Sequence, residues 1–126
     1  MIDLIKKLKQ FPELLVMGIA QQLLGALAYL HQRGIVHRDI KLDNIVFLDY
    51  NHTEIDYHIK IIDFGTAIKV NSYNKKIAGT RYYMSPEALK GALHEKSDVW
   101  SCGVFLYVFF TGVFPFKGKT LSEIEF

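Results

Sequence analysis

Residues 99–116 contain no charged side chain, and a segment of this kind has two possible locations. Its length is about the minimum that a helix needs to cross a bilayer. It is closed by Asp98 and Lys117, and it is diluted by small, polar or helix-breaking residues, namely Ser101, Gly103, Thr111, Gly112 and Pro115. A helix that is apolar on every side can equally be the buried centre of a globular domain. We favour the buried helix and expect no membrane span, with a membrane protein as the less favoured alternative.

Length and composition predict one globular domain. The chain has 126 residues, half of them hydrophobic, which is enough for a sizeable core. A net charge of +2 gives no electrostatic reason to expect nucleic acid as a partner. The single cysteine, Cys102, excludes an internal disulfide and suits a reducing compartment, so we expect an intracellular, cytoplasmic protein. Asp3 and Lys6 interrupt any apolar stretch that could act as a signal peptide.

The spacing of apolar residues predicts a first long helix. Pro12 and Glu13 form a favourable start, and Gly34 is placed to end the helix in the left-handed conformation. The apolar residues that recur at helical spacing are Leu15, Val16, Ile19, Ala20, Leu23, Leu24, Leu27 and Ala28. Residues 35–44 lack this period and are expected to form an ordered loop.

One small β-hairpin is predicted in the middle of the chain. Residues 45–49 and 58–62 are short β-prone runs, and the polar segment 50–57 joins them. Residues 65–80 are polar and irregular, which indicates a long loop. The predicted fold class is therefore mainly α with one small β-hairpin.

Three further helices are expected after this loop. Ser85 is a candidate cap for a short helix that starts at Pro86 and ends near Gly91. Ser97 is a candidate cap for the long apolar helix. Thr120 and the acid three residues later have capping-box spacing for a last helix.

The segment His37-Arg38-Asp39-Ile40-Lys41-Leu42-Asp43-Asn44 holds the polar groups that phosphoryl transfer requires. That reaction needs a carboxylate that orients the attacking hydroxyl and accepts its proton, oxygen ligands for magnesium, and a cation near the moving phosphoryl group. Asp39, Asn44 and Lys41 could supply these three functions from one loop. The alternative interpretation is a charged surface loop.

A second candidate is Asp63-Phe64-Gly65, which directly follows the apolar residues 59–62. A strand that delivers a carboxylate to a glycine turn gives a reasonable geometry for a metal ligand. The alternative interpretation is an ordinary turn at the end of a strand.

In order and spacing, these elements resemble the protein kinase signature set: HRDxxxxN, then DFG, then an APE-type triplet, here Ser85-Pro86-Glu87. The resemblance covers nearly the whole chain. Within the superfamily, the chain is similar to the calcium/calmodulin-dependent group, especially the calcium-dependent kinases of plants and protists. The stretches that carry this similarity are residues 60–65, 79–87 and 95–101.

The resemblance implies the C-terminal lobe of the protein kinase (α+β) fold. Residues 1–126 would be a partial catalytic domain, from the end of the family's helix D to the start of its helix G. The glycine-rich GxGxxG loop and the VAIK-type lysine of the family have no counterpart in this sequence, so we expect the N-terminal lobe to be absent. We therefore expect this chain alone to be inactive, with the missing lobe or another kinase lobe as a candidate partner.

The same resemblance implies a Ser/Thr protein kinase that uses ATP and Mg²⁺ and acts on protein substrates. Asp39 would be the catalytic base. Lys41 would contact the transferred phosphate, and its position two residues after Asp39 favours Ser/Thr over Tyr substrates. Asn44 and Asp63 would hold magnesium, and Thr80 would form hydrogen bonds near Asp39 and Lys41.

Other residues would shape the surroundings of the site. Val46 would form part of the floor under adenine. His37 and Phe64, the latter followed by Gly65 in the DFG turn, would belong to the stacked side chains that link the two lobes. Asp98 would anchor the backbone of the catalytic loop from below. The alternative role for Asp98 is a helix cap, and both roles are compatible.

Arg38 marks the type of kinase that is often controlled by phosphorylation of the activation loop. Thr66, Ser72 and Tyr73 are available there, but the usual phosphate position is occupied by Lys76. We therefore predict that activity does not depend on phosphorylation at that position. In the family, Glu87 pairs with a later arginine, and this sequence ends before one.

Substrate recognition is implied at a few positions. The family builds the pocket for the residue after the phosphoacceptor where this sequence has Ile77, Arg81 and Met84. Asp43 could attract basic substrate side chains, whereas Val108 stands where some basophilic kinases have an acid. A non-catalytic lobe that binds a peptide through residues 79–87 is the alternative function.

Overall fold

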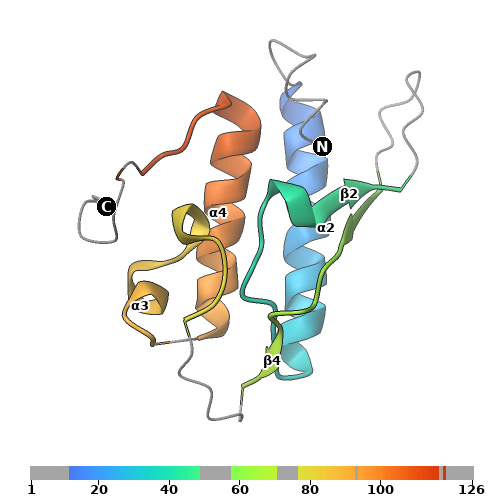
Figure 1. Cartoon of the computed structure of the whole chain (residues 1–126). Coiled ribbons are helices and arrows are strands. Elements are labelled where there is room, and N and C mark those ends of the chain that lie inside the picture. The colour runs from blue at the N-terminus through green and yellow to red at the C-terminus, as the bar shows by residue number, and fades with distance from the viewer. Residues whose placement is uncertain (1–11, 49–57, 71–76, 93, 117, 119–126) are drawn as a thin grey trace.

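The computed structural model describes residues 12–48, 58–70, 77–92, 94–116 and 118. At its centre, α2 (Glu13–Gln32) and α4 (Glu95–Thr111) lie side by side and run in opposite directions (Figure 1). The smaller elements are β1 (Ile35–Val36), β2 (Ile45–Phe47), β3 (Ile59–Ile61), β4 (Ile68–Lys69), α3 (Pro86–Leu89), and two 3₁₀ turns, η1 (Leu42–Asn44) and η2 (Arg81–Tyr83). The predicted fold class, mainly α with a small β-hairpin, is confirmed.

Helix α2 lies at the predicted position, and only one narrow stripe of its surface is buried. It begins directly after Pro12, and Gly34 follows it with a φ of +67°. Its buried side chains are Leu15, Ile19, Leu23 and Leu27. Leu24 is 45% exposed and Ala28 is also exposed, although both recur at the helical spacing that predicted this helix. Each follows a core residue by one position, which turns it about 100° away from the buried face.

Among the described helices, α2 is long and apolar enough to cross a membrane by length and composition. Its most apolar window has a mean hydropathy of 1.5, and 28% of that window is buried. In the structure its apolar stripe packs in one hydrophobic core with Phe105 and Phe109 of α4. The core helix of a globular protein can have the same length and apolar composition, so these two properties alone are weak evidence for a membrane span.

The long apolar segment forms α4, but its start differs from the prediction. His94 is the N-cap: its Nδ1 accepts a hydrogen bond from Lys96 N at 3.2 Å. Ser97 is the third residue of the helix, and its hydroxyl accepts from His94 N at 3.4 Å. The prediction of Ser97 as the cap was therefore wrong by one turn. The helix ends at Thr111, with Gly112 in the left-handed conformation.

Helix α4 is buried along one face only. Phe105 and Phe109 are fully buried and stack at 5.8 Å between ring centroids. Val99, Tyr107 and Phe110 are exposed, because the described residues leave this part of the helix surface uncovered. The prediction of a helix buried on every side is therefore not met among the described residues.

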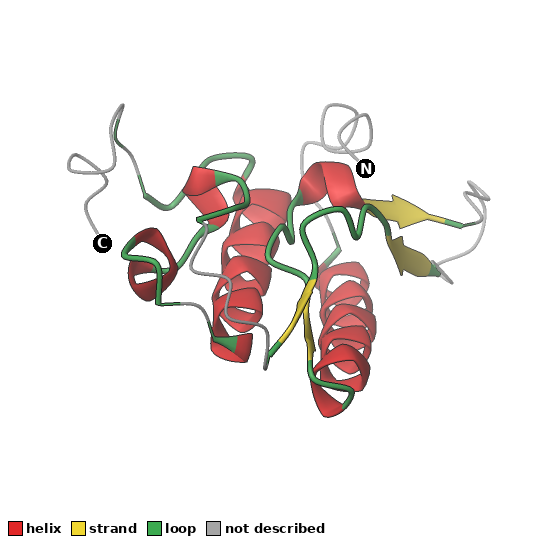
Figure 2. Cartoon of the chain, turned by 60° about the horizontal axis from the view of Figure 1, so that its bottom comes forward, coloured by secondary structure: helices red, strands yellow, loops and turns green. Residues whose placement is uncertain are grey.

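The predicted hairpin is present, and a second ladder accompanies it. Strands β2 and β3 are antiparallel, and Ile59 N donates to Gln22 Oε1 at 3.0 Å, which ties the hairpin to α2. Strands β1 and β4 form another antiparallel pair, which lies against the two long helices (Figure 2). Residues 35–44 and 65–80 were predicted to be irregular, and this prediction missed strands β1 and β4, which lie within them. Strands of two residues are too short to show a sequence period. The hairpin connection 49–57 and the predicted last helix from Thr120 lie outside the described residues.

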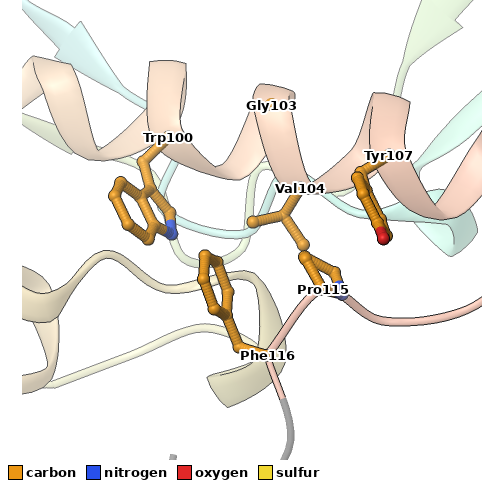
Figure 3. Close-up of a pocket in the computed structure, with 6 residues that line it drawn as sticks. All are labelled: Trp100, Gly103, Val104, Tyr107, Pro115 and Phe116. Carbon is orange, nitrogen blue, oxygen red and sulfur yellow. The ribbon is translucent and has the colours of Figure 1, made fainter. Parts of the chain in front are cut away.

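The segment after α4 turns back along the helix. The rings of Phe116 and Trp100 stack at 5.4 Å with an interplanar angle of 16°. Beside them is a pocket of about 290 Å³, where Trp100 and Val104 face Pro115 and Phe116 (Figure 3). Its remaining lining residues are Gly103 and Tyr107, so this pocket offers apolar surface and no charged side chain.

Cys102 is expected to be unreactive in the folded protein. Its side chain is 1% exposed, and burial raises its pKa to about 11. Since the thiolate is the nucleophile, alkylation near pH 8 should be about 10²-fold slower than in denaturant. The measurement is the alkylation rate of the peptide that contains Cys102, followed by mass spectrometry. A native rate close to that of glutathione would contradict the burial.

Candidate active site

Asp39 lies at the centre of the site and is held by groups from two distant parts of the chain. Its Oδ1 accepts hydrogen bonds from Thr80 N at 2.9 Å and from Thr80 Oγ1 at 2.8 Å. Its Oδ2 lies 2.8 Å from Lys41 Nζ and accepts from Asn44 Nδ2 at 3.1 Å. Four donors therefore fix both oxygens of a buried carboxylate.

These contacts decide the charge of Asp39. Burial by itself raises the pKa of Asp39, but hydrogen bonds from Lys41 and Thr80, together with the charge of Lys41, outweigh it. The pKa therefore lies below its ordinary value. Asp39 is thus ionised at neutral pH, and the stability that its contacts contribute is lost only as the pH falls through this lowered pKa.

Lys41 and Thr80 complete the cluster. Lys41 Nζ donates to Thr80 Oγ1 at 3.0 Å while it also contacts Asp39. The structure thus brings together the four residues predicted as catalytic, including the contact expected of Thr80. Asn44 also donates to Asp39 O at 2.8 Å, which closes the loop on itself.

Asp98 holds the backbone of this loop. It is 1% exposed, and its oxygens accept from His37 N and Arg38 N, each at 2.9 Å. These bonds support Arg38 at a φ of +70°, an unfavourable conformation for a residue with a β-carbon. Asp98 lies in the first turn of α4, but His94 is the N-cap, so the alternative role of Asp98 as a cap is wrong.

His37 and Phe64 are in contact, as the resemblance implies. Their rings lie 4.8 Å apart at an angle of 69°. His37 Nδ1 accepts from Asp39 N at 3.3 Å, and Nε2 lies 3.2 Å from the carbonyl oxygen of Ile62. Since a carbonyl only accepts, these contacts assign the imidazole proton to Nε2.

Asp63 starts a tight turn beside Asn44. Its φ is +62°, its Oδ1 accepts from Gly65 N at 3.1 Å, and its side chain is exposed. Ile62 N donates to Asn44 O at 2.9 Å, which holds this turn next to the loop. Because Asn44 donates both bonds through Nδ2, its Oδ1 is the atom suited to a metal.

One carboxylate and one amide oxygen fit Mg²⁺ that is shared with substrate phosphates, since this ion prefers oxygen ligands and retains water. Among the described residues, no three His, Cys, Asp or Glu side chains gather into a metal cage. The donor set of Asn44 and Asp63 therefore suits a shared ion and not an enclosed one.

The remaining predicted residues differ in burial. Val46 is half-buried in β2, whereas Asp43, Ile77, Arg81 and Glu87 are exposed. Met84 is buried and lines a small cavity with Arg38 and Asp98. Met84 therefore lies beneath the loop that carries Arg38 and Asp39. Of the three residues predicted to form the peptide pocket, only Ile77 and Arg81 are exposed.

Arg38 is connected to the segment after Asp63. Its Nε donates to the carbonyl oxygen of Thr66, and Thr66 Oγ1 donates to His37 O at 3.0 Å. Burial lowers the pKa of Arg38, although the charge of Asp98 opposes this. Ser72, Tyr73 and Lys76 lie outside the described residues.

His31 also contacts this site, and no prediction from the sequence included it. Its Nε2 lies 2.9 Å from Asp98 Oδ2, and it therefore belongs to the support of the loop. The two residues are 67 positions apart, and no local motif marks His31.

Replacing Gly79 with alanine should damage the site. Gly79 has a φ of +114°, and a β-carbon there would lie 2.3 Å from Arg38 O, next to Asp39. We expect a loss of at least about 2 kcal/mol in the free energy of unfolding, together with displacement of Thr80. Gly112→Ala is the matched control: its φ is +74°, but the space around it is open, so about 1 kcal/mol is expected. Equal losses in urea unfolding would contradict the close approach.

A loop that presents Asp39, Lys41 and Asn44 beside an Asp-Phe-Gly turn is the arrangement of a phosphotransferase site. The protein kinase domain family matches residues 1–125, and the chain belongs to that family. The class predicted from the motifs is confirmed.

Within the family, the chain is similar to calcium-dependent protein kinases. It is 42% identical to calcium-dependent protein kinase 5 of Plasmodium berghei (strain Anka), over 98% of this chain and 22% of that protein. It is 41% identical to calcium-dependent protein kinase 4 of Plasmodium falciparum (isolate 3D7), over 98% of this chain and 24% of that protein. The chain thus spans less than a quarter of the length of these relatives. The similarity predicted from the sequence is confirmed.

Proposed function

We propose that the whole protein is a Ser/Thr protein kinase that transfers the γ-phosphate of ATP to a serine or threonine hydroxyl of a protein. The observation that carries this proposal is the Asp39 carboxylate, ionised and held by Lys41, Thr80 and Asn44. Magnesium-bound ATP would supply the phosphoryl group and the cations that neutralise its charge.

Each residue of the cluster has a defined task in this proposal. Asp39 orients the hydroxyl of the substrate and accepts its proton. Lys41 Nζ, 2.8 Å from Asp39, places a positive charge where the phosphoryl group moves. Thr80 holds the Asp39 and Lys41 side chains in fixed positions relative to each other. Asn44 and Asp63 would hold the magnesium ions.

The test is a phosphotransfer assay on the whole protein with ATP, Mg²⁺ and three peptides that differ only in a single Ser, Thr or Tyr. We expect transfer to the Ser and Thr peptides, none to the Tyr peptide, and complete loss with EDTA. Because the relatives are named calcium-dependent, the assay is run with calcium and with a calcium chelator. Transfer to tyrosine alone, or no transfer in any condition, would refute the proposal. Peptide binding without transfer would favour the alternative of a non-catalytic binding module.

Activity should not depend on a phosphate at position 76, because a lysine there cannot provide negative charge. Treatment of the whole protein with a Ser/Thr and Tyr phosphatase should therefore leave its rate unchanged. The measurement compares initial rates before and after treatment, with loss of all phosphate verified by mass spectrometry. Abolished activity would count against this prediction.

A further inference from the structure

His31 contacts a carboxylate that the candidate active site already uses. It lies in the last turn of α2 with a side chain that is 14% exposed, and its Nε2 is 2.9 Å from Asp98 Oδ2. The same Oδ2 accepts from His37 N, and Oδ1 accepts from Arg38 N. Since a carboxylate oxygen accepts hydrogen bonds and Oδ2 already accepts one from His37 N, we assign the proton of this contact to His31 Nε2.

The contacts form a continuous chain from α2 to the catalytic loop. His31 binds Asp98, Asp98 binds the amide of His37, and His37 Nδ1 accepts from the amide of Asp39. Asp98 is 1% exposed, so a carboxylate oxygen that loses a donor there cannot be compensated by bulk water. Removing the donor at His31 would therefore change how Asp98 holds the loop.

We propose that His31 is a positioning residue. It fixes the orientation of the Asp98 carboxylate, and through it the backbone from His37 to Asp39, so that α2 as well as α4 sets the position of the base. The effect on phosphotransfer rests on the proposed function, whereas the effect on the loop does not.

The test uses three variants of the whole protein. His31→Phe keeps an aromatic ring but removes the donor, and His31→Gln keeps a side-chain N–H at a similar reach. Gln32→Ala changes the exposed neighbour and serves as the matched control. Amide hydrogen exchange is measured by mass spectrometry for peptides that contain residues 37 and 38, with a peptide from the far end of α4 as the internal reference.

We expect the amides of His37 and Arg38 to exchange about tenfold faster or more in His31→Phe, since a hydrogen bond to a charged group is lost. His31→Gln should restore slow exchange, and Gln32→Ala should not change it. In the phosphotransfer assay, His31→Phe should lower kcat with little change in the KM for ATP, and His31→Gln should recover kcat. If the unmodified protein transfers no phosphate, the proposed function fails while the exchange data still decide the role of His31.

Unchanged exchange in His31→Phe, or exchange in His31→Gln as fast as in His31→Phe, would overturn the proposal. A measurement on the unmodified protein covers the case in which His31→Phe does not fold. The ¹⁵N chemical shifts of the His31 ring should show a protonated Nε2. An unprotonated Nε2 cannot donate to Asp98 and would also overturn the proposal.

Discussion

Replacing Asp39 with asparagine is expected to lower kcat for phosphotransfer by about 10²–10⁴-fold, the usual contribution of a general base. Asparagine has nearly the same shape, and its oxygen can still accept from Thr80. Its amide nitrogen, however, cannot accept a proton, and it would face Lys41 Nζ or Asn44 Nδ2, which are donors as well. The measurement is kcat and KM for ATP in the whole protein, together with a circular dichroism spectrum that reports folding.

Glu13→Gln is the matched control for this variant. It makes the same carboxylate-to-amide change on an exposed residue in the first turn of α2, far from Asp39 in the sequence. Its kcat should equal that of the unmodified protein. A folded Asp39→Asn protein with unchanged kcat would show that Asp39 is not the base.

Replacing Phe105 with alanine is expected to reduce the free energy of unfolding by about 3–5 kcal/mol. Phe105 is 0% exposed, stacks on Phe109 and belongs to the core between α2 and α4. Since small domains are stable by only about 5–15 kcal/mol, this single change would remove much of the stability. Urea unfolding of the 126-residue chain measures the loss.

Phe110→Ala on the same helix is the control. Phe110 is 56% exposed, so its truncation should cost no more than about 1 kcal/mol. A loss for Phe110→Ala as large as that for Phe105→Ala would mean that another surface covers this face of α4.

Much of the fold could be predicted because its signals are local. The helical spacing of Leu15, Ile19, Leu23 and Leu27 and the glycine after them define α2. The cap of α4 was misplaced because Ser97 is a typical capping residue, whereas its actual role as the third residue of the helix depends on His94. The β1–β4 ladder could not be predicted, since its register is set by how distant segments pack and not by local pattern.

The residues of the candidate site also fall into two groups: those that a local motif marks and those that only the three-dimensional structure reveals. Asp39, Asn44 and Asp63 lie in short motifs, so the sequence alone marks them. The approach of Thr80 to Asp39 was implied only by resemblance, because forty-one positions separate them. His31 has no motif at all, and only the three-dimensional contact with Asp98 reveals it.

The left-handed backbone at Arg38 and Asp63 has a consequence for engineering. Among the described residues, these two are the only ones other than glycine with a positive φ, and each conformation costs about 1–2 kcal/mol. Glycine would relieve this backbone strain, at the loss of the hydrogen bonds that the Arg38 and Asp63 side chains form with Thr66 O and Gly65 N. At position 63 it would also remove the carboxylate that is proposed to hold magnesium, so selection for heat resistance and selection for the proposed phosphotransfer would act in opposite directions there.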